Sequence, residues 1–173
     1  SWEEMRRDVS VLSRELVLDN FNPQVIVGIS RGGLIPGVML SHWFQKPFKP
    51  IKASMRDFAD EDDAWEDYYP RKSDERVLIV DDICDTAGTL VKAADLLLSK
   101  GALEVHAYIT HGVLSGTAVK RISASSLKSL VVTDSIEATQ EVKESPKIRS
   151  VATAPMLAQA MLNIAHGRSV SSL

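Results

Sequence analysis

Hydrophobic residues near the start of the chain recur at the spacing of a helix. Each member of the pattern follows the one before it by three or four positions: Trp2, Met5, Val9, Leu12 and Leu16. Residues spaced in this way lie on one face of an α-helix, which turns once in about 3.6 residues. The sequence therefore predicts an amphipathic helix that ends near Asp19 and Asn20.

Short β-branched runs then alternate with further helical stretches. Strands are predicted over residues 25–29, 51–55, 77–80, 105–109 and 130–132, and helices over 34–44, about 90–100 and 154–165. Turns are predicted over 46–50 and 81–88, and no segment repeats another. This alternation favours an α/β fold, in which helices cover both faces of a parallel sheet and ligands bind at the carboxyl ends of the strands.

The stretch from Arg56 to Lys72 shows no hydrophobic period. Of the 23 acidic residues of the chain, seven lie between Asp57 and Asp67, where there is no Lys or Arg. The other 16 acidic residues face all 20 basic ones, so the rest of the chain is net positive by four and can attract a polyphosphate. We expect a flexible loop over about residues 56–74.

Length and composition indicate one folded domain over residues 1–173. The chain is 45% hydrophobic and 25% charged, and it has no apolar run as long as a membrane span. The single cysteine, Cys84, excludes an internal disulfide and a cysteine-based zinc site. The start does not resemble a signal peptide, which favours a cytoplasmic protein without a membrane partner. The net charge of −3 argues against nucleic acid as the main partner.

The segment from Val77 to Leu90 carries the strongest candidate chemistry. Three carboxylates, those of Asp81, Asp82 and Asp85, follow a hydrophobic strand, and the first two are expected to face outward. The next residues lead into a helix, where their backbone amides form a cradle for a phosphate: Thr86, Ala87, Gly88 and Thr89. Carboxylates accept hydrogen bonds from ribose hydroxyls and tolerate Mg²⁺. The alternative is a solvated turn before an ordinary helix cap.

This order of residues resembles the phosphoribosyl pyrophosphate (PRPP) signature of the type I phosphoribosyltransferases. The resemblance implies a twisted, mostly parallel five-stranded sheet flanked by helices, with a small hood. It implies that Asp81 and Asp82 bind the ribose hydroxyls, with Mg²⁺ held through PRPP or water, and that Asp85 lies near the base nitrogen. The residues that match the 5-phosphate loop are Thr86, Ala87, Gly88 and Thr89.

A second polar loop follows the first predicted strand of the sheet. Its residues are Ser30, Arg31, Gly32 and Gly33. Backbone amides and the Arg31 guanidinium can bind a pyrophosphate there, and the resemblance implies a strained peptide that glycine accommodates. Glycine pairs are also common in ordinary turns, which is the alternative interpretation.

The two parts of the chain resemble different families. Residues 1–54 are similar to bacterial and phage purine phosphoribosyltransferases of the xanthine-guanine type, in Ser1–Glu3 and Ile29–Pro36. Residues 77–173 are similar to the C-terminal half of ribose-phosphate pyrophosphokinase, which makes PRPP. The matching motifs are Asp85–Thr89, Thr110–Gly116, Val131–Asp134 and Ser169–Leu173. A natural fusion or an engineered joining of the two would explain this pattern.

These resemblances imply a Mg²⁺-dependent phosphoribosyltransferase that moves ribose 5-phosphate from PRPP to a base and releases pyrophosphate. A 6-oxopurine is the favoured base, as in purine salvage, and a homo-oligomer is expected. Arg31 is expected to neutralise the pyrophosphate and Asp85 to take a proton from the base. The alternatives are a pyrophosphokinase-like fragment and a protein that binds PRPP or nucleotides without turnover.

Base recognition is the open part of this hypothesis. Purine enzymes of the family stack the base on an aromatic residue of the hood, whereas no aromatic residue follows Tyr108 here. Thr110 and His111 occupy that region, and His111 could contact a ligand or serve the structure. Aromatic residues that could stack on a base from the flexible loop are Trp65, Tyr68 and Tyr69.

Overall fold

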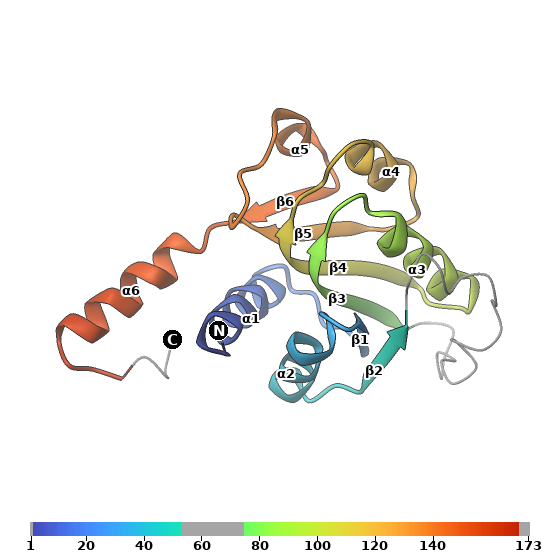
Figure 1. Cartoon of the computed structure of the whole chain (residues 1–173). Helices are drawn as coiled ribbons and strands as arrows, with labels where there is room; N and C mark the ends of the chain where they lie inside the picture. The colour runs from blue at the N-terminus through green and yellow to red at the C-terminus, as the bar shows by residue number, and fades with distance from the viewer. Residues whose placement is uncertain (1, 53–74, 170–173) are drawn as a thin grey trace.

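Within residues 2–52 and 75–169, which the computed structural model describes, six strands form one sheet. Every neighbouring pair is parallel, and the order across the sheet is β2-β1-β3-β4-β5-β6 (Figure 1). The strands are β1 (Val25–Ser30), β2 (Phe48–Lys52), β3 (Arg76–Cys84), β4 (Glu104–Gly112), β5 (Ser129–Thr133) and β6 (Ile148–Val151). The predicted α/β fold with a mostly parallel sheet is confirmed.

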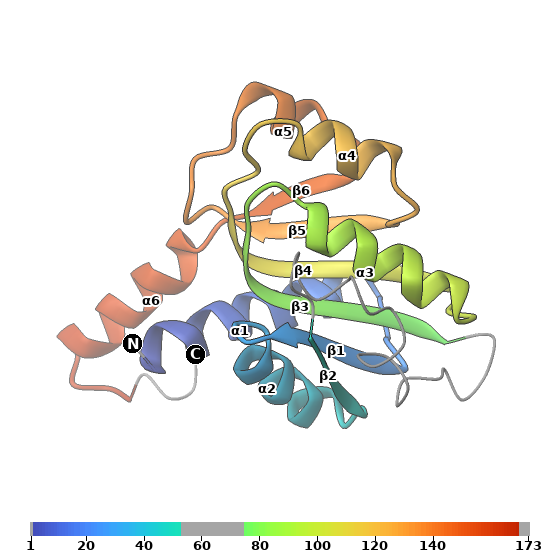
Figure 2. The same ribbon diagram turned by 45° about the vertical axis from the view of Figure 1, so that its right-hand side comes forward.

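Helices lie on both faces of the sheet (Figures 1 and 2). They are α1 (Trp2–Leu18), α2 (Leu34–Phe44), α3 (Gly88–Ser99), α4 (Ala118–Ala124), α5 (Gln140–Glu144) and α6 (Ala154–Ala165). Side chains of α3, α4 and α5 share one buried cluster with the sheet, and side chains of α1 and α2 share a second. None of these helices is long and apolar enough to cross a membrane.

The apolar residues of β3 contribute side chains to both buried clusters. Val77 and Ile79 belong to the cluster beneath α3, whereas Leu78 and Val80 belong to the cluster beneath α1 and α2. Successive side chains of a strand point to opposite faces, so a strand covered on both faces must be apolar at every position. All four side chains are fully buried, which explains why this strand could be predicted from the sequence.

The strand β3 is longer than predicted. It continues through Asp81 and Asp82 to Cys84, where the sequence predicts a turn over residues 81–88. The extension occurs because β4 is equally long, and Asp81 and Ile83 pair with Ile109 and His111 of that strand. The polar turn is therefore shorter and lies between Cys84 and the start of α3.

The edges of the sheet also differ from the prediction. The strand β6, which makes the sheet six-stranded rather than five-stranded, was not predicted, because only its first and last residues are buried. At the other edge, β2 begins within the turn predicted over residues 46–50. Proline is compatible with a strand at the edge of a sheet, which explains Pro50. Residues 53–55 of the predicted strand, the predicted flexible loop 56–74 and its three aromatic residues lie outside the described residues.

The order of the strands changes direction between β1 and β3. The chain runs from β1 outward to β2 at one edge, and β3 is then added on the other side of β1. In open α/β sheets a crevice for ligands forms at the carboxyl ends of the strands at such a point. The loops that follow β1 and β3 are the two that the sequence analysis identified.

Candidate functional site

Two loops meet at the carboxyl ends of β1 and β3. Gly28 of β1 pairs with Val80 of β3, so the loop after β1 lies beside the end of β3. A Cβ atom added at Gly32 would overlap the carboxylate of Asp82, and one added at Gly33 would overlap the carbonyl oxygen of Val80. The loop approaches β3 so closely that a side chain at Gly33 would overlap fixed backbone, whereas one at Gly32 would require the Asp82 side chain to move.

Asp81 and Asp82 are adjacent but lie in different surroundings. Asp82 is exposed, whereas Asp81 is half-buried and accepts a hydrogen bond of 2.9 Å from the Asp82 backbone N–H. Burial is the main cause that raises the pKa of Asp81 to about 7; the amide of Asp82 opposes this rise and the charge of Asp82 adds to it. Asp82 is thus exposed, as predicted, whereas Asp81, one position earlier in the strand, is only partly exposed.

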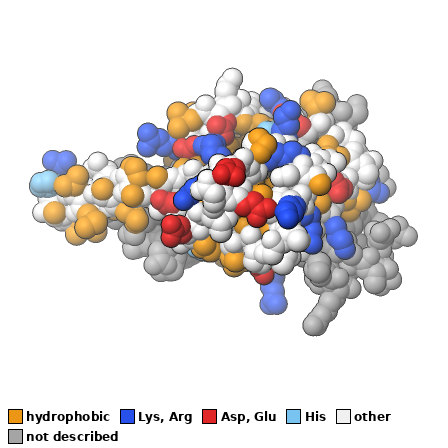
Figure 3. All heavy atoms as spheres, turned by 90° about the horizontal axis from the view of Figure 1, so that it is seen from above, with side chains coloured by type: hydrophobic (Ala, Val, Ile, Leu, Met, Phe, Trp, Pro, Cys, Tyr) orange, Lys and Arg blue, Asp and Glu red, His pale blue; other side chains and the backbone are white. Residues whose placement is uncertain are grey.

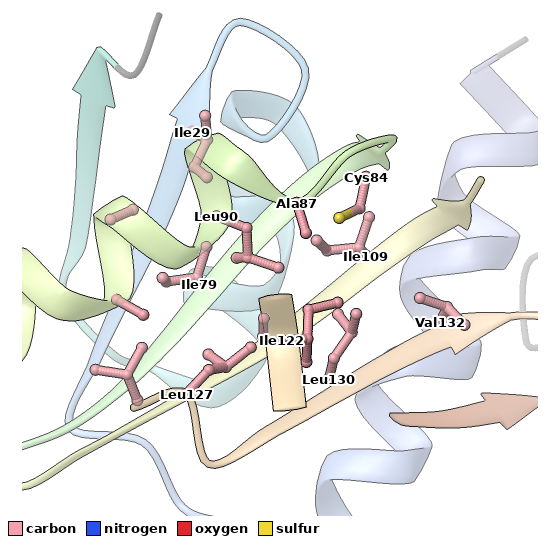
Figure 4. Close-up of a cluster of buried hydrophobic side chains, with 14 of the residues drawn as sticks. Ile29, Ile79, Cys84, Ala87, Leu90, Ile109, Ile122, Leu127, Leu130 and Val132 are labelled. Carbon is pink, nitrogen blue, oxygen red and sulfur yellow. The ribbon is translucent and has the colours of Figure 1, made fainter. Parts of the chain in front are cut away.

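The turn between β3 and α3 packs against the buried cluster on one side and is exposed to solvent on the other. Ala87 precedes α3 in a left-handed conformation, with φ of 58°. Its side chain and that of Cys84 point into the buried cluster (Figure 4), whereas Asp85 and Thr86 are exposed. The first backbone N–H groups of α3, from Gly88 on, have no acceptor within the helix and lie at its positive end. This arrangement suits a phosphate group.

The remaining predicted residues lie at the same end of the sheet. Ser30 is the last residue of β1, and the peptide bond between it and Arg31 is cis. Arg31 is exposed, and its guanidinium makes no hydrogen bond or ion pair with another residue of 2–52 or 75–169. Thr89 lies in the first turn of α3 and is partly buried. The predicted site residues thus lie at one end of the sheet, at the ends of β1 and β3, in the loops that follow them and in the first turn of α3.

A third segment, between β4 and α4, holds the turn after β3 in place. The Ser115 N–H donates to the carbonyl of Asp85 at 3.0 Å, and the Ser115 hydroxyl donates to Asp85 Oδ1 at 2.5 Å. From α4, the guanidinium of Arg121 donates to the carbonyl of Thr86. Neither Ser115 nor Arg121 is among the site residues predicted from the sequence. Ser115 lies in the Thr110–Gly116 motif, but the Arg121 contact spans 35 residues and has no local signal.

His111 belongs to a network of hydroxyl groups. Its Nδ1 lies 2.8 Å from Ser135 Oγ. Ser135 and Thr133 donate to the carbonyl of Thr110 at 3.3 and 2.7 Å. Of the two possibilities for His111, these contacts favour a structural role.

The carboxylates do not form a complete metal cage. In the described parts of the chain, no group of three or more His, Cys, Asp or Glu residues is placed to hold a metal ion. Asp81 and Asp82 nevertheless supply oxygen ligands, and Mg²⁺ typically uses one or two carboxylates together with water and substrate phosphates. The residues present therefore fit a Mg²⁺ ion that arrives with a phosphorylated ligand.

A cavity of about 460 Å³ opens near the amino-terminal ends of the strands, away from the two loops. None of the predicted site residues lines it. The hydroxyl of Tyr108 donates to Asp19 Oδ2 at 2.6 Å, and Arg149 pairs with Asp19 and Glu15. These contacts satisfy Tyr108, Asp19 and Arg149, whereas the buried Nε2 of His106, which also lines the cavity, has no hydrogen-bond partner among the described residues. Because the cavity contains none of the predicted site residues, the two loops remain the candidate site.

Comparison with known proteins identifies the second part of the chain. Residues 73–173 match the phosphoribosyl synthetase-associated domain. The ribose-phosphate pyrophosphokinase of Cereibacter sphaeroides is 65% identical over 98 residues, which are 57% of this chain and 29% of that protein. The enzyme of the same name from Caulobacter vibrioides is 54% identical over 100 residues, 58% of this chain and 32% of that protein. The chain thus spans about a third of the length of these relatives.

Solved structures share the fold over most of the chain. The phosphoribosylpyrophosphate synthetase of Mycobacterium smegmatis has a TM-score of 0.69 at 21% identity, over 92% of this chain and 51% of that one. For the xanthine-guanine-hypoxanthine phosphoribosyltransferase of Helicobacter pylori the TM-score is 0.51 at 13% identity, over 94% and 96%. The fold is that of the type I phosphoribosyltransferases, as predicted. Since the domain match covers more than half of its residues, the chain belongs to the phosphoribosyl synthetase-associated domain family.

Proposed function

We propose that the chain binds 5-phosphorylated ribose, as PRPP or ribose 5-phosphate, between the loops after β1 and β3, and transfers the phosphoribosyl group of PRPP to an acceptor. The turn after β3 supports this best. It presents the N-terminus of α3 beside two carboxylates, Asp81 and Asp82, above the buried side chains of Cys84 and Ala87. A phosphate suits the helix N-terminus and a vicinal diol suits the carboxylates.

Each residue has a distinct task in this proposal. Asp81 and Asp82 accept hydrogen bonds from the ribose hydroxyls and orient the sugar. Arg31, which is exposed and unpaired within the described residues, binds the pyrophosphate as it departs. A Mg²⁺ ion held by Asp81 and Asp82 with the ligand supplies further positive charge. Asp85 accepts a proton from the acceptor, and Ser115 fixes the orientation of its carboxylate.

The proposed acceptor is a 6-oxopurine, and ATP-dependent synthesis of PRPP is the second candidate, favoured by the identity of 65% to a pyrophosphokinase. Two assays separate them. Pyrophosphate release from PRPP is measured with guanine, xanthine, hypoxanthine, adenine, uracil and orotate, and AMP release is measured from ATP with ribose 5-phosphate. We expect pyrophosphate with the 6-oxopurines. AMP without pyrophosphate would contradict base transfer and support the second candidate.

Ribose 5-phosphate, but not free ribose, is expected to stabilise the fold. The phosphate cradle is the most complete part of the site, whereas the hydroxyl contacts alone are weak. With Mg²⁺ present and ligand at one hundred times its dissociation constant, the stabilisation is about 2.7 kcal/mol. A thermal-shift series with ribose, ribose 5-phosphate and PRPP measures it. Equal shifts for ribose and its phosphate would contradict the assignment of the cradle.

Arg121→Ala is expected to weaken the binding of ribose 5-phosphate about five- to tenfold, because the Thr86 carbonyl loses its donor and the turn loses a support. Calorimetry measures the affinity. Arg121→Lys retains a donor and should recover part of the loss. Lys120→Ala is the matched control, since it removes an exposed cation from the same helix. Equal losses for Arg121→Ala and Lys120→Ala would point to net charge rather than to support of the turn.

A further inference from the structure

The imidazole of His106 has one ring nitrogen in use and one without a partner. Its Nδ1 lies 2.7 Å from Ser129 Oγ, whereas its buried Nε2 has no hydrogen-bond partner in the part of the chain that the structure describes. The ring also packs against Phe21, with 4.1 Å between the ring centroids. Buried polar atoms of folded proteins nearly always have a partner, so Nε2 retains an unused bonding position on a ring that is held in place.

A carboxylate lies beside this nitrogen at a distance that suits a shared metal ion. Glu104 and His106 are two positions apart on β4, so their side chains lie on the same face of the sheet. Glu104 Oε1 is 3.6 Å from His106 Nε2, which is too long for a hydrogen bond. Zinc binds histidine nitrogen at about 2.0–2.1 Å and carboxylate oxygen at about 2.0–2.2 Å, so one ion can contact both atoms with an angle of about 120° between them.

The surroundings of His106 favour the neutral ring that a metal ion requires. Burial is the main cause that lowers the pKa of this imidazole, and the charge of Lys128 lowers it further, whereas Glu104 and Asp19 oppose the shift. In the neutral tautomer whose Nδ1–H donates to Ser129 Oγ, the lone pair of Nε2 is free. Histidines that bind metal ions are oriented in this way by a hydrogen bond from their other nitrogen.

The cavity of about 460 Å³ near the amino-terminal ends of the strands provides room for further ligands. Glu104 and His106 both line it, and a polar cavity of this size admits water. Three cations also line it: Arg76, Lys147 and Arg149. Arg149 pairs with Asp19, and Lys147 donates to the Ser125 carbonyl at 2.6 Å. No lysine or arginine of the described ranges forms an ion pair with Glu104, so its carboxylate is available.

We propose that His106 Nε2 and the Glu104 carboxylate bind a Zn²⁺ ion, with water from the cavity as its other ligands. An imidazole beside a carboxylate favours zinc over Mg²⁺, which takes oxygen ligands. The site lies at the amino-terminal end of β4, whereas the two loops follow the carboxyl ends of β1 and β3, so it does not depend on the proposed function. With two protein ligands, fewer than the three or four of catalytic and structural zinc sites, it binds the ion reversibly.

Calorimetric titration of the full chain with Zn²⁺ tests the proposal. Excess Mg²⁺ is present to occupy sites made of carboxylates alone, and Cys84 does not compete, because it is buried and burial raises the pKa of its thiol to about 12. We expect the affinity to fall at least thirtyfold in His106→Gln and in Glu104→Gln, since each variant loses one of two ligands. Ser129→Ala should weaken binding about tenfold, because the ring loses the hydrogen bond that orients it.

His166→Gln is the matched control, and it should leave the affinity unchanged. His166 is an exposed imidazole outside the cavity, and it follows α6, the helix that projects from the rest of the molecule (Figure 3). Circular dichroism establishes that each variant is folded, and Glu104→Gln retains the test if His106→Gln does not fold. Absence of Zn²⁺ binding by the wild type would overturn the proposal. Full affinity in Glu104→Gln, or equal losses in His106→Gln and His166→Gln, would overturn it as well.

Discussion

A Gly33→Ala variant is expected to unfold at a much lower urea concentration than the wild type. The added Cβ atom would overlap the carbonyl oxygen of Val80 and lie 2.7 and 2.9 Å from the backbone nitrogen and oxygen of Ile29. Backbone atoms of two paired strands cannot move aside as the end of a side chain can, so β1 and β3 would have to separate. Overpacking of this kind costs about 3 kcal/mol, which equilibrium urea unfolding measures directly.

The neighbouring variant Gly32→Ala is the matched control. Its Cβ atom meets the carboxylate of Asp82, which is exposed and can rotate away. We expect a stability loss below about 1 kcal/mol, as for most surface substitutions, but a weaker affinity for ribose 5-phosphate, because Asp82 is displaced. Unchanged urea midpoints in Gly33→Ala would show that the loop after β1 is not packed against β3.

Asp81→Asn is expected to make the ligand-free protein more stable at pH 8 and to weaken the binding of ribose 5-phosphate. The pKa of Asp81 is raised to about 7, mainly by burial, so ionisation of this group opposes folding. At about 1.4 kcal/mol per pKa unit, the rise corresponds to a gain of at most about 4 kcal/mol in the variant. Asparagine retains the oxygen that accepts the Asp82 N–H, so the local hydrogen bond survives.

The protonation state of Asp81 determines how the stability gain of Asp81→Asn depends on pH. Between about pH 4 and pH 7 the folded protein holds a proton at Asp81 that the unfolded chain has lost, so the stability of the wild type falls as the pH rises. Urea unfolding should give a gain for Asp81→Asn below about 1 kcal/mol at pH 4 and most of its full value at pH 8. Asp95→Asn, on the exposed side of α3, is the control and should show no such trend. A gain independent of pH would exclude ionisation as its cause.

The strand β3 and the loops after β1 and β3 could be predicted because their sequence patterns do not depend on distant parts of the chain. Residues 77–80 are apolar at every position because β3 is covered on both faces, and this pattern identifies the strand without any knowledge of its neighbours. The loops after β1 and β3 could be identified in the same way, since each joins an apolar strand to a helix. Every residue predicted for the site lies in one of these two loops or in the strand end or helix turn that adjoins it.

The rest depends on contacts between distant parts of the chain. The extension of β3 to Cys84 depends on pairing with β4, and the half-buried state of Asp81 follows from that extension. Arg121 approaches Thr86 only after α4 has packed against α3. Short elements such as α5 and β6 contain too few buried residues to produce a period. Such features need the assembled structure.

The pairing of β1 with β3 also determines when the site can form during the synthesis of the chain. β1 ends at Ser30 and β3 begins at Arg76, so the two strands can pair only by closing a long loop. Parallel strands that lie far apart in the sequence pair slowly. A ribosome adds roughly 5–20 residues per second. A nascent chain in which β3 has not yet been translated contains the loop after β1 but neither the two carboxylates nor the phosphate cradle. Under the proposed function, binding of 5-phosphorylated ribose would therefore begin only when both halves of the site have been translated, so this ligand would stabilise the finished domain but would not assist its first half to fold.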